Sequence, residues 1–250
     1  MDDLAAGRLA RSAVEIPADS SLREAGEGVD ERDVCRSRVT PARLFAKKKS
    51  FRAIERDTPQ WQQYRRAFCA WLLTLNLARL VFIDESFAKT GMRRAYGWSP
   101  RGTRSFGKMP VRSWKTVSLV GAIRLGERPR LMTHRGSVDG ATFIRFVKNY
   151  LVPSLKRGDI VVMDNLNIHK MKRVRELIAA AGAIAVYLPT YSPELNPIEL
   201  WWNDLKRELR KLAIDVEADL RRAARRERAR VALAKIRNWF GHAIEEARLN

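Results

Sequence analysis

Two short apolar runs, LVFID at residues 80–84 and DIVVMD at residues 159–164, each end in an aspartate, and these runs most constrain the fold. Short stretches of Val, Ile, Leu and Phe bounded by polar residues are typical of buried strands. Chemistry in open sheets commonly gathers at the carboxyl ends of parallel strands. The pattern therefore predicts that Asp84 and Asp164 lie at one edge of a sheet.

A third acid, Glu199, opens an amphipathic helix in SPELNPIELWW, with 34 residues between it and Asp164. Each acid alone has a structural explanation. An Asp after a strand commonly starts a turn, and Glu199, with Asn196 as N-cap and Pro197 at the first helical position, fits a capping box. Capping sets no distance between elements, whereas a metal pair needs carboxylates from several elements. We therefore predict that Asp84, Asp164 and Glu199 hold two Mg²⁺ or Mn²⁺ ions.

The charge of the chain favours a polyanionic partner. Its 250 residues include 48 Lys and Arg against 28 Asp and Glu, a net charge of +20. Residues 1–33 hold nine acids and four bases, a net of −5, so the remainder carries about +25. Neutralising phosphates releases counterions and drives binding; a basic surface without a dedicated ligand is the alternative. Two cysteines without metal-ligand spacing predict a reducing, cytoplasmic location. We expect neither a secretory signal nor a membrane span.

Periodicity and turn residues predict the remaining elements. Further strands are expected at RRAYGWSP (93–100), TVSLVGAIRL (116–125), LMTHRGSV (131–138) and IAVYLP (184–189). Helices are expected after Pro59, at 139–155 with Asp139 as its cap, at 170–182 and at 196–212. Early strands followed by alternating helices and strands predict an α/β fold, a mixed sheet flanked by helices that is compatible with a ribonuclease-H-like architecture.

Composition divides the chain into four predicted parts. These are a poorly ordered segment at 1–46 without a clear helix-turn-helix, a basic linker and helix at 47–78, an α/β domain at 79–212 that carries the three acids, and a basic helical tail at 213–250. The tail contains six arginines between Arg221 and Arg230. Such a run is typical of a solvated helix face, and it also suits a phosphate backbone.

The acids lie in segments that resemble a known family. LVFIDESFAKTGMRRAYGWSPRGTR, TVSLVGAIRL, DIVVMDNLNIHK and VYLPTYSPELNPIELWWNDLKRELR resemble the catalytic core of DDE transposases, over roughly residues 47–212. They are most similar to the bacterial insertion-sequence 630 family, which is related to mariner-type elements. The resemblance implies a ribonuclease-H-like fold and metal-dependent DNA cleavage and strand transfer by Asp84, Asp164 and Glu199. Alternatives are a ribonuclease-H-like nuclease without strand transfer and an inactive DNA-binding remnant.

The resemblance also implies partners. These are element ends and target DNA at a TA dinucleotide, a homodimer assembled on DNA, no membrane, and a bacterial, nucleoid-associated location. Family members carry helix-turn-helix modules before the core. Residues 1–46 lack the regular apolar helices of such a module, so a separate helix-turn-helix chain is a further expected partner.

Residues beside the acids are candidates for positioning or DNA contact. Asn165 and His169 match the motif around the second acid, and either position its loop or contact DNA. The motif before the third acid is matched by five residues, which either shape the turn that presents Glu199 or contact the substrate directly: Tyr191, Ser192, Pro193, Asn196 and Pro197. Glu85 is not assigned to the metal, because adjacent strand residues point to opposite faces.

A basic, aromatic segment at residues 93–115 offers a second DNA contact. Arg101, Arg104 and Lys108 are suited to grip phosphates, while a neighbouring aromatic such as Trp98 stacks on an unpaired base. The alternative interpretation places the aromatic residues of this segment in the core of a hairpin.

Overall fold

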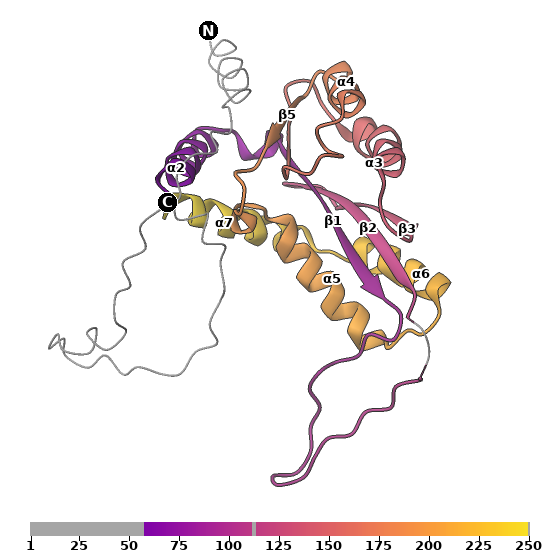
Figure 1. Cartoon of the computed structure of the whole chain (residues 1–250). Coiled ribbons are helices and arrows are strands. Elements are labelled where there is room, and N and C mark those ends of the chain that lie inside the picture. The colour runs from indigo at the N-terminus through magenta and orange to yellow at the C-terminus, as the bar shows by residue number, and fades with distance from the viewer. Residues whose placement is uncertain (1–57, 112–113, 250) are drawn as a thin grey trace, which may run out of the picture. The chain divides into compact units, whose positions relative to one another are not determined.

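A computed structural model describes residues 58–111 and 114–249, so the predictions for residues 1–57 lie outside the described residues. Five strands form one sheet in the order β3-β2-β1-β4-β5 (Figure 1). The strands are β1 Leu80–Lys89, β2 Thr116–Arg124, β3 Arg130–Arg135, β4 Ile160–Met163 and β5 Ile184–Tyr187. β1, β2 and β3 pair antiparallel, whereas β4 and β5 run parallel to β1. This is the mixed sheet that the sequence predicts.

Helices cover both faces of the sheet (Figure 1). They are α2 Pro59–Leu73, α3 Gly140–Phe146, α4 Lys172–Ala180, α5 Ile198–Leu212, α6 Glu217–Ala229 and α7 Leu233–Arg248. Short 3₁₀ turns are η3 Leu77–Arg79, η5 Val152–Ser154 and η6 Pro193–Leu195, and one π-helical turn, η4 Val147–Leu151, follows α3. The Asp139 carboxylate accepts a hydrogen bond from the Thr142 amide at 2.8 Å, which confirms the predicted cap of α3.

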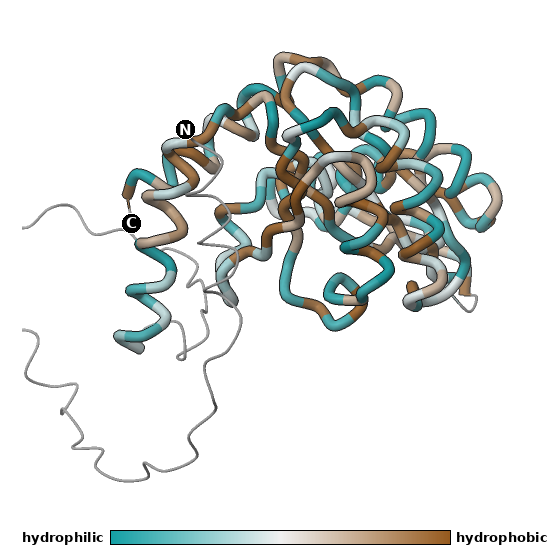
Figure 2. Tube along the Cα trace, turned by 90° about the horizontal axis from the view of Figure 1, so that it is seen from above, coloured by the Kyte–Doolittle hydropathy of each residue, from teal (hydrophilic) through white to brown (hydrophobic). Residues whose placement is uncertain are grey.

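Side chains that alternate along β1 enter two separate cores. Val81 and Ile83 pack with α3, η4 and α4, whereas Leu80 and Phe82 pack with α2 and α5–α7. The two faces of a strand alternate with period two, so the sheet is buried on both sides. Figure 2 accordingly shows hydrophobic, brown segments in the interior of the packed part of the chain.

The C-terminal helices belong to the packed body. Leu220 and Ala224 of α6 and Ile236 of α7 are buried in the core around α5, and Phe240 of α7 stacks edge-on against Phe82 at 5.5 Å between ring centres. The basic run of α6 is also anchored, since the Arg228 guanidinium donates to the Pro129 carbonyl at 3.2 Å. Residues 217–248 therefore pack against the body of the protein, while Arg222, Arg225, Arg226 and Arg230 are exposed, in agreement with the predicted solvated helix face.

The prediction of a strand at residues 93–100 is wrong, because these residues lie in an irregular connection between β1 and β2. Tyr96 and Trp98 are 92% and 102% exposed. The predicted hairpin core is absent for the same reason: within the described parts of this connection these aromatic rings have no sheet face to cover. A strand needs a paired neighbour and a buried face, and neither is supplied at this point of the chain.

No helix among the described residues is both long and apolar enough to span a membrane.

Candidate active site

Asp84 lies on β1 and is 9% exposed. It follows Phe82 by two residues, so it faces the α5 side of the sheet, as the strand period requires. The indole N–H of Trp202 on α5 donates to Oδ2 of Asp84 over 3.1 Å. Burial raises the pKa of Asp84 to about 7, and the negative charge of Glu199 adds to the rise. This carboxyl group therefore sits in a site where negative charge lacks compensation.

Asp164 follows β4, which runs parallel to β1. Phe82 pairs with Val162, and two further residues on each strand lead to Asp84 and Asp164. The two acids therefore lie level with each other on neighbouring strands. The prediction that Asp84 ends its strand is wrong, because β1 continues to Lys89 by pairing with β2, whereas Asp164 does follow the end of β4. Asp164 Oδ1 also accepts from the Leu166 amide at 3.1 Å, which is the turn geometry expected of an Asp after a strand. Asp164 therefore forms the local turn and also lies level with Asp84.

His169 is fully buried and bridges two carboxylates. Its Nδ1 lies 2.6 Å from Oδ1 of Asp164, and its Nε2 lies 2.9 Å from Oε1 of Glu85. The ring also packs against Phe143, with 4.4 Å between ring centres. A residue with no exposed surface has no access to DNA, so the predicted DNA contact of His169 is wrong. The alternative, a residue that positions the loop, agrees with this geometry.

The bridge sets the charge of its members. Burial opposes a charged His169, but the hydrogen bonds to Asp164 and Glu85 outweigh it and raise the pKa of His169 to about 10. Burial also opposes a charged Asp164, yet the hydrogen bonds from His169 and the Leu166 amide outweigh it and leave the pKa of Asp164 below its ordinary value. Glu85 points away from Asp84, as the strand period predicts, and serves this bridge.

Asn165 ties together the turns after two parallel strands. Its side-chain amide donates to the Leu188 carbonyl, just beyond β5, at 2.6 Å. This bond supports the interpretation that Asn165 positions the loop. Contact of Asn165 with DNA stays a prediction.

Glu199 lies in the first turn of α5 and is half-buried. The predicted capping box is wrong: α5 begins at Ile198 with Pro197 as its N-cap, and no side chain caps it. Asn196 instead accepts a bond of 3.4 Å from the Ile198 amide. Burial raises the pKa of Glu199, the positive charge of Lys206 opposes the rise, and Asp164 adds to it. Glu199 is thus electrostatically linked to both other acids.

The turn before Glu199 is held by a residue that sequence reasoning missed. Arg65 of α2 is 5% exposed, forms an ion pair with Glu194 and donates to the Ser192 hydroxyl at 2.5 Å. Tyr191, at the start of this turn, has a φ of 59°, a left-handed conformation that is uncommon outside glycine. Arg65 and Glu194 are far apart in the sequence, so no local sequence pattern indicates their buried ion pair.

Lys206 is the second residue that sequence reasoning missed. It is half-buried on α5, seven residues after Glu199, and its ammonium lies 5.2 Å from the centre of the Phe87 ring. Burial lowers the pKa of Lys206, while the charges of Glu199 and Asp84 act in the opposite direction. The spacing of two helical turns from Glu199 is the signal that places it on the same helix face.

The three predicted acids thus lie on β1, just after β4 and on α5, and each influences the pKa of another. Over residues 58–111 and 114–249, however, no three His, Cys, Asp or Glu side chains form a ready-made metal cluster. The fit to a divalent ion rests on the donor chemistry, because carboxylate oxygens are what Mg²⁺ prefers and a cation would relieve the buried charge of Asp84.

The three cations predicted to contact DNA differ from the acid site in their exposure to solvent: they are Arg101, Arg104 and Lys108. All three are exposed in the connection between β1 and β2. The base of the connection is held to the segment after α5 by the ion pair of Arg93 with Asp215 at 2.7 Å. The structure therefore leaves these cations accessible, and their contact with DNA stays a prediction.

A mixed sheet with helices on both faces, and with carboxylates gathered on β1, after β4 and on α5, defines an α/β protein with an acidic site. A family model described as DDE superfamily endonuclease matches residues 79–221. The chain belongs to this family, which confirms the predicted family. No curated protein sequence matches the chain.

Solved structures of Mos1, a mariner transposase, share the fold. The Mos1 paired-end complex with the left transposon end is 17% identical, with a TM-score of 0.66 over 83% of this chain and 66% of that chain. The Mos1 catalytic domain with Raltegravir and Mg is 16% identical, with a TM-score of 0.57 over 76% of this chain and 93% of that chain. This likeness confirms the predicted ribonuclease-H-like fold. The chain spans about two thirds of the length of the Mos1 chain in the paired-end complex.

Proposed function

We propose that this protein is a transposase that cuts DNA at the ends of a mobile element and joins the cut end to target DNA. The observation that carries the proposal is the convergence of Asp84, Asp164 and Glu199 from β1, the turn after β4 and α5. Membership of a DDE endonuclease family and the strongly basic composition support it. Assignment to the insertion-sequence 630 family and a preference for TA target sites are parts of the same proposal.

The proposed cofactor is a pair of Mg²⁺ or Mn²⁺ ions held by Asp84, Asp164 and Glu199. Such ions, when bound, activate an attacking oxygen and stabilise the leaving 3′ oxygen. Paired-end complexes of Mos1 are described with Mg and with Mn, which supports divalent ions of this kind here.

The chain's own residues would divide the remaining work. His169, held by Glu85, orients one oxygen of Asp164. The ammonium of Lys206 lies on the helix face that carries Glu199 and is suited to a DNA phosphate. Arg101, Arg104 and Lys108 would grip the backbone from the exposed connection, and the exposed ring of Trp98 is suited to stacking on a base.

The proposed partners are element ends and target DNA, bound by a homodimer. Mos1 is described in complexes with a transposon end and after strand transfer, which supports DNA as the partner. A separate helix-turn-helix chain for end recognition and a place at the bacterial nucleoid in the cytoplasm complete the proposal.

The test is metal-dependent nicking and strand joining of plasmid DNA by the purified chain, with Asp164→Ala as the active-site variant. Glu176→Ala on α4 is the matched control, because it removes an exposed carboxylate whose ion-pair partners among the described residues are the surface bases Lys172 and Arg173. We expect nicking and joining in the unchanged protein and in Glu176→Ala, and neither in Asp164→Ala.

Each other outcome has a distinct meaning. Nicking without joining favours a ribonuclease-H-like nuclease over a transposase. Metal-independent DNA binding with no cleavage in any of the three proteins favours an inactive remnant. Activity that survives Asp164→Ala rejects the acid site.

A further inference from the structure

A single indole connects two of the proposed metal-binding elements. Trp202 on α5 is 1% exposed, and its Nε1 donates to Oδ2 of Asp84 on β1 over 3.1 Å. The indole N–H is a donor with no acceptor capacity, and each carboxylate oxygen has two acceptor sites. The bond therefore fixes the Asp84 carboxylate and leaves it able to bind a cation.

The position of Trp202 on its helix makes this bond a link between acids. Trp202 follows Glu199 by three residues, so both project from one face of α5. A bond from Trp202 to Asp84 consequently fixes the first turns of α5 against β1. The spacing of Asp84 and Glu199 depends on this contact.

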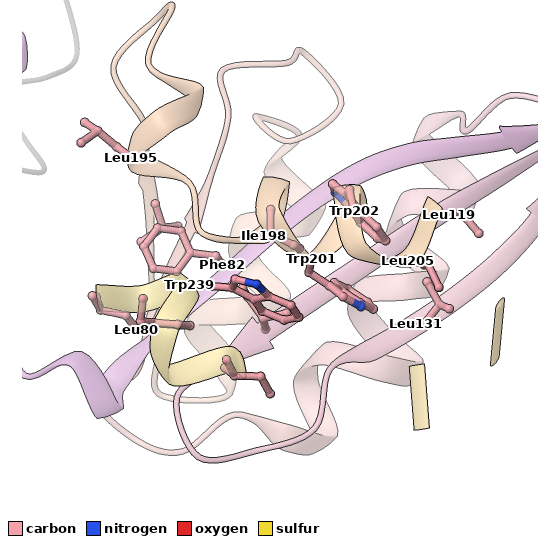
Figure 3. Close-up of a cluster of buried hydrophobic side chains, with 14 of the residues drawn as sticks. Leu80, Phe82, Leu119, Leu131, Leu195, Ile198, Trp201, Trp202, Leu205 and Trp239 are labelled. Atoms are coloured by element: carbon pink, nitrogen blue, oxygen red, sulfur yellow. The ribbon is translucent and has the colours of Figure 1, made fainter. Parts of the chain in front are cut away.

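The backbone of the sheet is adapted to this ring. Gly121 on β2 is the direct partner of Asp84 in the β1–β2 register. A Cβ atom at Gly121 would lie 2.5 Å from Cζ3 of Trp201 and 2.6 Å from Cη2 of Trp202. The two indoles stack with 4.4 Å between ring centres, and Figure 3 shows both rings between α5 and the sheet. Glycine at this one position gives the rings room beside Asp84.

The two neighbouring tryptophans differ in one respect. Nε1 of Trp202 is bonded to Asp84, whereas Nε1 of Trp201 is buried with no hydrogen-bond partner among the described residues. Apolar packing explains both rings equally. It does not explain why one N–H is directed at the buried acid.

We propose that Trp202 is a positioning residue, whose indole N–H fixes the Asp84 carboxylate and the spacing of β1 and α5, and thereby sets the affinity of the acid site for a divalent ion. The proposal rests on the proposed function, because it takes Asp84 and Glu199 as metal ligands. Partners that orient metal ligands typically contribute about 10- to 100-fold in metal affinity.

The test compares Trp202→Phe with Trp201→Phe. Each substitution keeps an aromatic ring and removes one N–H, so the two variants differ only in whether that N–H holds Asp84. Mn²⁺ binding to the full chain is measured by isothermal titration calorimetry, and folding by thermal unfolding in EDTA. We expect Trp202→Phe to weaken Mn²⁺ binding by about tenfold or more, and Trp201→Phe to change it less than twofold. In DNA nicking, saturating Mn²⁺ should restore most of the rate of Trp202→Phe, because only the metal affinity is impaired.

Unchanged Mn²⁺ affinity in folded Trp202→Phe overturns the positioning role. Equal weakening in both variants also overturns it, because packing of the ring pair would then account for the effect. If the unchanged protein binds no Mn²⁺, the proposed acid site itself fails. Mn²⁺ binding that depends on Trp202 without any DNA cleavage would reject the transposase and keep the positioning role.

Discussion

Asp84 and Asp164 lie level with each other on β1 and just after β4, yet their surroundings change their pKa values in opposite directions. Asp84 is enclosed by apolar side chains and one neutral donor, and burial with the nearby charge of Glu199 raises its pKa to about 7. Asp164 is 40% exposed at its side chain and is held by a buried histidine, which keeps its pKa low. Among the described residues the first acid forms no ion pair, although the charge of Lys206 interacts with it, whereas the second acid is already paired with His169.

The difference indicates what each acid contributes to the proposed site. A carboxylate that lacks a cation gains most when a metal ion arrives, because the ion relieves buried charge. A carboxylate already held by His169 gains less, but its oxygen is fixed in place before any ion arrives. The free energy of metal binding would thus come mainly from Asp84, and the geometry of the metal site would be set mainly by Asp164.

The largest expected effect is on catalysis. Asp84→Asn and Asp164→Asn should each lower metal-dependent DNA cleavage by about 10³-fold or more, since metal-ion catalysis supplies several kcal/mol. Their metal-free stabilities should change in opposite directions at pH 8. Asp84→Asn removes an unfavourable buried charge and raises Tm, whereas Asp164→Asn weakens the His169 bridge and lowers Tm. A shift in the same direction for both variants would contradict the contrast between the two acids.

A second prediction concerns how the gain in stability of Asp84→Asn depends on pH. Asp84 has a folded pKa of about 7 and an ordinary value of 3.8. At pH below 3.8 it is protonated in both states and costs nothing; the cost of its charge develops as pH rises through about 7 and is complete above. In EDTA, Asp84→Asn should therefore match the unchanged protein near pH 4 and exceed it at pH 8, by on the order of 2–4 kcal/mol. Urea unfolding across this range measures the difference; a constant difference would reject the raised pKa.

The third prediction concerns the bridge itself. His169→Ala should cost about 2–3 kcal/mol of unfolding free energy, less than for a fully buried pair because Asp164 is partly exposed. His242→Ala, which removes an exposed histidine, should cost almost nothing. Because the folded pKa of His169 is about 10 and its ordinary value is 6.5, its stabilising charge is fully present below pH 6.5 and lost as pH rises through about 10. The cost of His169→Ala should shrink over that interval; equal costs at pH 6 and pH 10 would show that the bridge is not ionic.

The sequence predicts the two acids for a physical reason that applies to few other residues. β1 and β4 are buried on both faces, so each reads as an unbroken apolar run, and a carboxylate at the end of such a run is conspicuous. The opposite orientation of Glu85 also follows from the strand period. The partners do not follow: the indole of Trp202 belongs to an apolar helix face, and nothing local distinguishes it from the packing role of Trp201.

The prediction of a strand in the connection between β1 and β2 is wrong for the opposite reason. Residues 93–100 include two aromatic residues, Tyr96 and Trp98, a residue type that favours strands, although Gly97 and Pro100 do not. Strand formation depends on a paired neighbour and a surface to cover, which are properties of the tertiary structure. The ion pair of Arg65 and Glu194 is likewise a consequence of α2 meeting the turn before α5, and its two residues carry no matching local pattern.

The fourth prediction tests the packing around the first acid. Gly121→Ala places a methyl group against Trp201 and Trp202, so it should cost about 1–3 kcal/mol in unfolding free energy, as overpacked cores do. Gly241→Ala on α7 is the control, because a Cβ there meets no atom within 4 Å. It should stabilise α7 by about 0.5–1 kcal/mol. If Gly121→Ala is tolerated without loss of stability, the two rings are free to move and Asp84 is less tightly enclosed than the contrast requires.

The smallest effect should come from the exposed connection between β1 and β2, because neither burial nor an ion-pair partner among the described residues strengthens the effect of a charge at Arg101 or Arg104. Replacing Arg101 and Arg104 with Ala should lower the slope of log Kobs against log salt for duplex DNA by about 2, as expected for the loss of two phosphate contacts. Stability should not change, since both residues are exposed. Replacing Lys172 and Arg173 on α4 removes the same charge from a surface where Glu176 already partners both residues, and controls for net charge. A salt slope that falls equally in both double variants would mean that DNA responds to overall charge. A fall confined to Arg101 and Arg104 would make the connection a DNA-contacting segment that acts through accessible charge, in contrast to the two enclosed acids.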